Sequence, residues 1–392
     1  MFSIRTYNKI SDKGLSLFPS SRYSLGEDEA APQGIILRSH KLHNEVLPDT
    51  VRAVARAGAG TNNVPVADYS EKGIVVFNSP GANANAVKEL VLAGMLLSSR
   101  GILEGHQYVS SLTEMSDAAE MSNLMEKEKK RFSGSELQGK TLGIIGLGAI
   151  GSLVADAALN LGMNVLGYDP ALSVDAAWRL PSTVERQENL QSMLPRVDYL
   201  SLHVPAIDAT KNLINAETLS QMKASAVLLN FAREAIVNSS DVVSALDNQA
   251  LRRYICDFPE PQLIGREDVL ALPHIGASTA EAEENCAIMA ARQLMDYLEN
   301  GNIVNSVNFP TTQMPRTEGT HRISFTNKNV SGVLSEVLGV IAKHKFNVAD
   351  LVNKSRGELA YSILDLDAAP NEALIAEICK LDPVINVEQF AN

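Results

Sequence analysis

Three residues suited to proton transfer beside a carboxylate each follow a separate apolar run between positions 228 and 274. They are Arg233 in NFAREA, Glu260 in DFPEP and His274 in LPHIGAST. A guanidinium can bind a substrate carboxylate through two hydrogen bonds. A histidine can accept a hydroxyl proton, and a carboxylate beside it can orient the ring and stabilise its protonated form. Together they suit the oxidation of a 2-hydroxy acid. Each alone also suits a surface ion pair, a solvated loop acid or a packed histidine.

A glycine-rich turn, GLGAIG, precedes these residues and has the spacing of a dinucleotide-binding turn. Gly146 would allow the tight turn, Gly148 the approach of a pyrophosphate, and Gly151 the close packing of a helix on its strand. Asp169 in GYDP lies roughly 20 residues further on, where an acid binds the ribose hydroxyls. A carboxylate there would repel a 2′-phosphate, which favours NAD over NADP. The alternative is a well-packed turn that binds no nucleotide.

The elements that must position these residues alternate between short apolar runs and helical patterns. The runs MNVLGYD, VDYLSLHVP, AVLLNFAR, RRYICDFP and DVLALPHI each end near a polar residue. This alternation predicts the α/β class, with a doubly wound, Rossmann-like parallel sheet here and a second one in the first hundred residues. Since ligands bind outside the carboxyl ends of such strands, Arg233, Glu260 and His274 are expected to converge.

The first hundred residues show a similar alternation and carry two arginines at expected strand ends. We expect buried strands at 34–38, 51–58 and 73–78 and a helix at 83–100, with Arg38 and Arg56 at or near strand ends. The chain carries a formal net charge of −12, so an anionic ligand needs a local basic cluster such as this pair. The alternative is two structural ion pairs. Lys88 is compatible with a role at the phosphate, at the cofactor or in solvent, and the sequence does not decide between them.

The last part of the chain predicts a separate small unit. A helix is expected at 278–301, a linker at 305–320 and, from His321, the order β-α-β-β-α-β of ferredoxin-like folds. The domain boundaries are therefore placed at 1–98 with 284–310, at 99–283 and at 318–392. The exposed sheet edge of the small unit favours pairing with a second copy, and hence a homo-oligomer. The charged stretch 116–131 predicts a solvated helix.

Composition excludes several classes of function. No apolar run approaches the roughly 20 residues that span a bilayer, and the first residues lack the pattern of a secretory signal. Three widely spaced cysteines favour reduced thiols and a cytoplasmic location. The negative charge disfavours non-specific binding of nucleic acid. No metal site is predicted.

The motifs GLGAIG, GYDP, LHVP, LLNFAR and PHIGAST, in this order, resemble those of the D-isomer-specific 2-hydroxyacid dehydrogenases. The small C-terminal unit resembles the ACT domains that some members carry. The resemblance implies that Arg233, Glu260 and His274 are catalytic and that Asp257 holds the nicotinamide carboxamide. DFPEP departs from the family by having two fewer residues between the aspartate and the glutamate. The expected NAD-binding residues are Gly146, Gly148, Ala149, Ile150, Gly151, Asp169, His203, Pro205, Ala232, Arg233, Asp257, His274 and Gly276.

The resemblance also implies a substrate and an effector. The expected reaction is oxidation of 3-phosphoglycerate, the first step of serine synthesis, with Arg38, Ser39, Arg56, Arg233 and His274 binding the substrate. L-Serine is the expected effector. The effector-binding residues would be Asn327, Asn329 and Asn347, although Asn327 replaces a frequent histidine and Ser331 a usual proline. Three alternatives stay open: another D-2-hydroxy acid as substrate, a non-catalytic NAD-sensing protein, and a C-terminal unit that binds no ligand.

Overall fold

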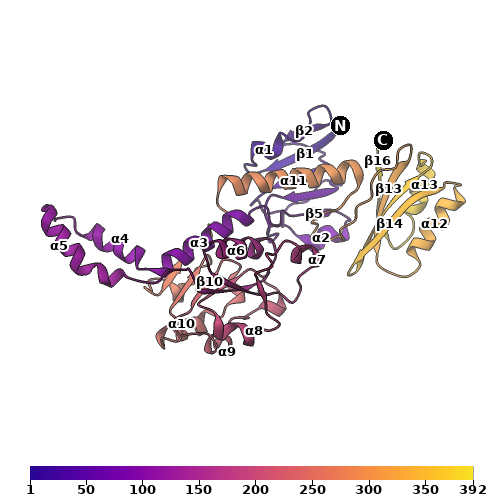
Figure 1. The fold of residues 1–392 in the computed structure, drawn as a ribbon. Coiled ribbons are helices and arrows are strands. Elements are labelled where there is room, and N and C mark those ends of the chain that lie inside the picture. Colours follow the sequence, from indigo (N-terminus) through magenta and orange to yellow (C-terminus); the bar gives the residue numbers. More distant parts are fainter. Residues whose placement is uncertain (392) are drawn as a thin grey trace. The chain divides into compact units, whose positions relative to one another are not determined.

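The computed structural model describes residues 1–391, except for the side chain at position 175. These residues form two compact units, one of Met1–Asn83 together with the chain from Ala280 onward, the other of Ala84–Thr279. The first unit contains a five-stranded parallel sheet and a four-stranded antiparallel sheet. The second contains a seven-stranded parallel sheet (Figure 1). The predicted α/β class, with two Rossmann-like sheets and a small C-terminal sheet, is confirmed.

The parallel sheet of the first unit has the strand order β2-β1-β3-β4-β5. Its central strands are apolar and buried on both faces, as a parallel sheet covered by helices requires. Helix α11 packs on it, with Ala290 and Leu294 in one core with Ile4 and Ile36. The elements are β1 (Phe2–Tyr7), β2 (Tyr23–Gly26), β3 (Gly34–Leu37), β4 (Ala53–Arg56), β5 (Val75–Phe77), α1 (Asp12–Leu15), α2 (Val66–Glu71) and α11 (Ala280–Asn300).

The sheet of the second unit has the order β12-β11-β10-β9-β6-β7-β8. The strand order reverses between β6 and β9, so the carboxyl ends of these neighbours form the switch point where such sheets bind ligands. The strands are β6 (Thr141–Ile145), β7 (Asn164–Tyr168), β8 (Glu185–Arg186), β9 (Tyr199–Leu202), β10 (Val227–Asn230), β11 (Arg253–Cys256) and β12 (Val269–Ala271). The helices around them are α6 (Ala149–Asn160), α7 (Val174–Ala177), α8 (Leu190–Met193), α9 (Ala216–Ser220) and α10 (Ser239–Asp247).

Helix α3 (Ala84–Ser99) belongs to the second unit, although the first domain was expected to extend to residue 98 and to contain it. Its residues Val87, Val91 and Met95 lie in one core with Ile144 and Phe231. The compact units therefore divide before α3 and at the start of α11. Helices α4 (Ile102–Ser111) and α5 (Ala118–Glu128) follow, contain no buried residue and extend away from the sheet of their unit (Figure 1). The expected solvated helix is confirmed by α5.

The C-terminal sheet has the order β14-β15-β13-β16, and the predicted β-α-β-β-α-β succession is confirmed. Helices α12 and α13 supply Val337, Ile341, Leu374 and other side chains to a core with Phe325 and Leu364 of the sheet. The elements are β13 (His321–Lys328), α12 (Val333–Lys343), β14 (Val348–Arg356), β15 (Leu359–Leu366), α13 (Glu372–Ile378) and β16 (Val384–Phe390).

The segment 305–320 is not the flexible linker that its composition suggested. Phe309 and Thr312 are fully buried, and Phe309 shares a core with Tyr361 from the sheet face opposite α12 and α13. Arg322, itself buried, pairs with Asp365 at 2.7 Å and donates to the Met314 carbonyl. The prediction of a linker was wrong because the few apolar residues among the Pro and Thr pack into the core of the unit.

Two further properties concern the described chain as a whole. Within residues 1–391, no helix combines the length and apolar character that crossing a membrane requires. Nor do three or more His, Cys, Asp or Glu side chains of the described residues gather as a set of metal ligands.

Candidate active site

The glycine-rich turn follows β6 and leads into α6, with two of its glycines enclosed by backbone. Gly146 has φ +92°, and a Cβ there would lie 2.5 Å from the His203 carbonyl oxygen. A Cβ on Gly151 would lie 2.0 Å from the Gly146 carbonyl oxygen. Both positions therefore require glycine for packing. Gly148 differs, because a Cβ there would meet nothing within 4 Å. The space above Gly148 is open to a ligand.

The start of α6 can bind an anion at that open space. Gly148 is its N-cap, Ala149 and Ile150 are its first residues, and its first turn contains no acidic residue. A helix N-terminus with free N–H groups and no competing carboxylate attracts phosphate. The local structure therefore fits the pyrophosphate of a dinucleotide.

Asp169 lies at the end of β7 and is tied to the same turn. One carboxylate oxygen accepts a hydrogen bond from the Leu147 backbone N–H at 2.8 Å, and the other accepts from Ala171 N–H at 2.9 Å. A carboxylate has about four acceptor positions, so two stay available for a pair of ribose hydroxyls. Asp169 fits the expected role at the ribose.

His203 follows β9 on the other side of the switch point. Its Nε2 lies 2.8 Å from Ser201 Oγ, while Nδ1 is buried with no hydrogen-bond partner among the described residues. Burial lowers the pKa of His203 to about 3, so the ring is neutral at neutral pH. Pro205, two residues on, is exposed and accepts from Thr210 Oγ1. A buried nitrogen without a protein partner beside the glycine-rich turn suits a hydrogen bond to a bound dinucleotide.

His274 occupies a strained loop after β12. Its φ is +58°, a left-handed conformation that costs most non-glycine residues of order 1–3 kcal/mol. Asp257, which is 1% exposed, accepts from the backbone N–H groups of Ile275 and Gly276 at 2.8 and 2.7 Å. A Cβ on Gly276 would lie 2.9 Å from that carboxylate. The buried aspartate thus holds the loop that presents the exposed His274 side chain.

Arg233 follows β10 and shares a neighbour with His274. The rings of His274 and Phe258 lie 4.6 Å apart between centroids, and the Arg233 guanidinium carbon lies 5.7 Å from the Phe258 centroid. Buried Asn230 shapes the turn before Arg233, accepting from Ala232 N–H and donating to the Arg233 carbonyl. The structure therefore brings Arg233 and His274 to one aromatic ring. Sequence reasoning missed Phe258, although it stands beside Asp257 in DFPEP.

Glu260 has a different partner. Its carboxylate accepts from Ser239 Oγ, at the start of α10, and lines a cavity of about 350 Å³ with Glu234 and Asn238. Among the described residues, no hydrogen bond or ion pair joins Glu260 to His274. The short loop that sets DFPEP apart places this carboxylate against α10.

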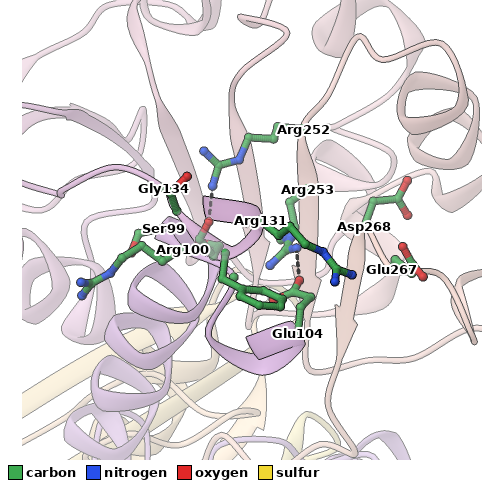
Figure 2. Close-up of a pocket in the computed structure, with 13 residues that line it drawn as sticks. Ser99, Arg100, Glu104, Arg131, Gly134, Arg252, Arg253, Glu267 and Asp268 are labelled. Atoms are coloured by element: carbon green, nitrogen blue, oxygen red, sulfur yellow. Dashed lines mark hydrogen bonds and ion pairs between the residues drawn. The ribbon is translucent and has the colours of Figure 1, made fainter. Parts of the chain in front are cut away.

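A larger cavity of about 500 Å³ lies near the amino ends of β11 and β12 (Figure 2). Arg253 pairs with Glu104 there, and Arg252 donates to the Ser98 carbonyl. Since the glycine-rich turn lies at the carboxyl ends, this cavity is not the dinucleotide site. Figure 2 shows further charged side chains around it, from Arg100, Arg131, Glu267 and Asp268.

The first unit places its expected substrate-binding residues at the carboxyl edge of its own sheet. Arg38 follows β3 and Arg56 ends the adjacent β4. Arg56 Nε donates to the Arg38 carbonyl at 3.1 Å, and Ser39 N–H donates to Asn8 Oδ1 at 3.2 Å. Two guanidiniums thus start from neighbouring strand ends. Lys88, in the other unit, donates to Asn85 on its own helix.

The expected effector residues lie at opposite ends of the C-terminal sheet. Asn329 follows β13 and donates to the Gly357 carbonyl, whereas Asn347 precedes β14 beside Asp367. The register pairs Lys328 with Leu359 but Val348 with Leu366, so about seven residue steps, or roughly 23 Å, separate them. One small ligand cannot contact both in a single chain. Asn327 is buried and its Oδ1 has no hydrogen-bond partner in the described residues.

Comparisons with known proteins agree with this geometry. Residues 92–276 match the model of the D-isomer specific 2-hydroxyacid dehydrogenase, NAD binding domain. The D-3-phosphoglycerate dehydrogenase of Haemophilus influenzae is 32% identical over 338 residues, 83% of this chain and 78% of that protein. Its Escherichia coli K12 counterpart is 33% identical over 325 residues, 79% of this chain and 73% of that one.

A solved structure supports the fold alone. NAD⁺-bound 3-phosphoglycerate dehydrogenase from Entamoeba histolytica matches with a TM-score of 0.59 at 24% identity, over 78% of this chain and 98% of that chain.

Proposed function

Since the chain belongs to the family of D-isomer-specific 2-hydroxyacid dehydrogenases, we propose that this NAD-dependent oxidoreductase converts 3-phospho-D-glycerate to 3-phosphohydroxypyruvate. The choice of a phosphorylated substrate rests on one observation, the pair of arginines Arg38 and Arg56 at one sheet edge of an acidic chain. An arginine pair suits a phosphate, because each guanidinium can donate two parallel hydrogen bonds to its oxygens. The relatives from Haemophilus influenzae and Escherichia coli, which cover about four fifths of this chain, are named D-3-phosphoglycerate dehydrogenase.

The residues around the glycine-rich turn would hold NAD, which supplies the hydride acceptor. Gly148 and the N–H groups at the start of α6 would bind the pyrophosphate, and Asp169 the ribose hydroxyls. Neutral His203 would offer its unpaired Nδ1 to the cofactor. Pro205, Ala232 and Gly276 would line the same site.

The chemistry is assigned to the loops after β10 and β12. Arg233 would bind the substrate carboxylate and His274 would accept the hydroxyl proton as the hydride leaves the carbon. Their shared contact with Phe258 supports this assignment. Glu260 would stabilise protonated His274, which requires its carboxylate to leave Ser239. Asp257 would fix the His274 loop, in addition to its expected contact with the nicotinamide carboxamide.

We include inhibition by L-serine in the proposal, at a pair of C-terminal units from two copies. The opposite positions of Asn329 and Asn347 in one sheet support this, because only two chains could offer both amides to one zwitterion. Millimolar L-serine should inhibit, and Asn347→Ala should remove the inhibition without changing catalysis. Calorimetry that detects no serine binding would rule out inhibition by L-serine at this domain.

A cytoplasmic location is also proposed, supported by three free cysteines, two of them buried.

The direct test follows NADH formation with 3-phosphoglycerate, D-glycerate and D-lactate. The proposal expects 3-phosphoglycerate to give a higher kcat/KM than either unphosphorylated acid. Preference for an unphosphorylated acid would establish a dehydrogenase of another 2-hydroxy acid. Binding of NAD without turnover of any of them would establish a sensing protein.

A further inference from the structure

The two arginines at the sheet edge of the first unit are held in place by the backbone around them. β3 and β4 are parallel neighbours with Leu37 opposite Arg56. A Cβ on Gly58 would lie 2.4 Å from Arg56 Nη1, so this guanidinium lies directly over the Gly58 backbone. Asn63 Nδ2 donates to the Arg38 carbonyl at 3.1 Å and fixes the following loop. The Arg56 guanidinium and the backbone of Arg38 are therefore fixed at adjacent strand ends, where both side chains are available to an anion.

A carboxylate of the same unit is paired with this site. Glu283, in the first turn of α11, has Oε1 at 2.7 Å from Arg38 Nη1. The side chains of Arg38 and Glu283 are 39% and 44% exposed. Water therefore reaches this ion pair and screens it. A contact of this kind can be exchanged for a stronger anion.

The buried thiol of Cys286, three residues after Glu283, shows that all three charges are close together. Burial is the main cause that raises the pKa of Cys286, while Arg56 and Arg38 lower it and Glu283 raises it further. The cluster thus has two positive charges and one negative charge. Glu283 neutralises half of the positive charge that a ligand would otherwise meet.

We propose that Glu283 is a tethered competitor for the substrate phosphate at Arg38. A phosphate with two negative charges can displace it, because a dianion gains more from two guanidiniums than a single carboxylate does. An uncharged end of a substrate gains nothing and leaves the Arg38–Glu283 pair intact. Glu283 thereby sets how tightly phosphorylated ligands bind and how readily the product leaves. The inference rests on the proposed function, in which Arg38 binds that phosphate.

The test compares Glu283→Gln with Glu281→Gln, which removes the same charge from the same helix turn. The Glu281 side chain has no hydrogen bond or ion pair with any residue in the described chain. Glu283→Gln should lower the KM for 3-phosphoglycerate and the calorimetric Kd for inorganic phosphate about 3- to 10-fold. Glu283→Gln should change the KM for D-glycerate less than twofold. The control variant Glu281→Gln should change the KM or Kd of every ligand less than twofold. In an Arg38→Ala background, Glu283→Gln should have no further effect on phosphate binding.

Two results would overturn the inference alone, and a third would overturn the proposed role of Arg38 together with it. Unchanged or weaker phosphate binding in Glu283→Gln would show that the carboxylate does not compete. Equal effects of Glu283→Gln and Glu281→Gln would reduce the role to general charge repulsion. If Arg38→Ala leaves the KM for 3-phosphoglycerate unchanged, the assignment of Arg38 in the proposed function fails, and the competitor role fails with it.

Discussion

The carboxyl edges of the two parallel sheets are built in contrasting ways. At the edge of the second unit, Gly146 and Gly151 pack against backbone and Asp169 and Asp257 accept backbone N–H groups. At the edge of the first unit, Arg38 and Arg56 are partly exposed, and Glu283 is the partner of Arg38. The first kind of edge depends on shape and the second on charge. Substitutions at the packed glycines of the second unit should therefore damage the fold, whereas substitutions at the two arginines should change ligand selectivity.

The largest effect is expected at Gly151, where the backbone leaves the least space for a side chain. In Gly151→Ala, the added Cβ must displace the Gly146 carbonyl, which should lower Tm and weaken NAD binding by about 100-fold or more. Gly148→Ala is the matched control, since its Cβ meets no protein atom within 4 Å. It should keep Tm and still weaken NAD binding by blocking the pyrophosphate. Normal NAD binding by Gly148→Ala would mean that Gly148 is not at the ligand, and an equal loss of Tm in the two variants would mean that the space above Gly148 is not open.

A large effect on turnover is expected at His274. His274→Asn removes the proton acceptor but keeps a residue type that tolerates positive φ, so the loop should persist. We expect kcat to fall by about 100-fold or more and NAD affinity to stay nearly unchanged. Stopped-flow turnover and NAD titration would separate the two quantities. A variant that turns over normally would make His274 a loop residue only.

A smaller effect is expected at Asp169, where charge and shape can be separated. Asp169→Asn keeps an acceptor for Leu147 N–H but removes the negative charge. NADP should then bind about 10-fold better relative to NAD, because the repulsion of the 2′-phosphate is gone. The ratio of the two Kd values is the measurement. An unchanged ratio would assign cofactor choice to another group.

The effect that is smallest near neutral pH, and that grows as the pH falls, concerns the stability of the fold. The pKa of His203 is about 3 in the folded chain, below its ordinary value near 6.5, so the unfolded chain binds one more proton between these limits. This stability is present above pH 6.5 and is lost as pH falls, by up to about 1.4 kcal/mol per pH unit. His203→Gln should lose less stability than the parent chain between pH 6.5 and 4 in denaturant titrations. Parallel curves would indicate that the pKa of His203 is the same in the folded and the unfolded chain.

The contrast between the edges also explains what the sequence could predict. The turn at Gly146–Gly151 and the acid at Asp169 were predictable because backbone geometry demands these residues at fixed spacing. The β-α-β-β-α-β order was predictable from apolar periodicity. Both depend on local sequence.

Other features depend on contacts between distant segments. The pairing of Arg38 with Glu283 joins β3 to α11, and spacing alone does not show it. Phe309 is buried against one face of a sheet whose strands come later in the sequence. The contact of Glu260 with Ser239 follows from a loop whose path was not predictable from its length.

The central claim is that the arginine pair of the first unit selects a phosphorylated substrate. The most direct measurement is the ratio of kcat/KM for 3-phosphoglycerate to that for D-glycerate, in the parent chain and in Arg56→Ala. A lost charge-assisted contact of about 1.5–3 kcal/mol should lower this ratio by roughly 10- to 100-fold, through KM of the phosphorylated substrate. A ratio that stays the same, because both substrates lose equally, would contradict the account and make Arg56 a structural residue.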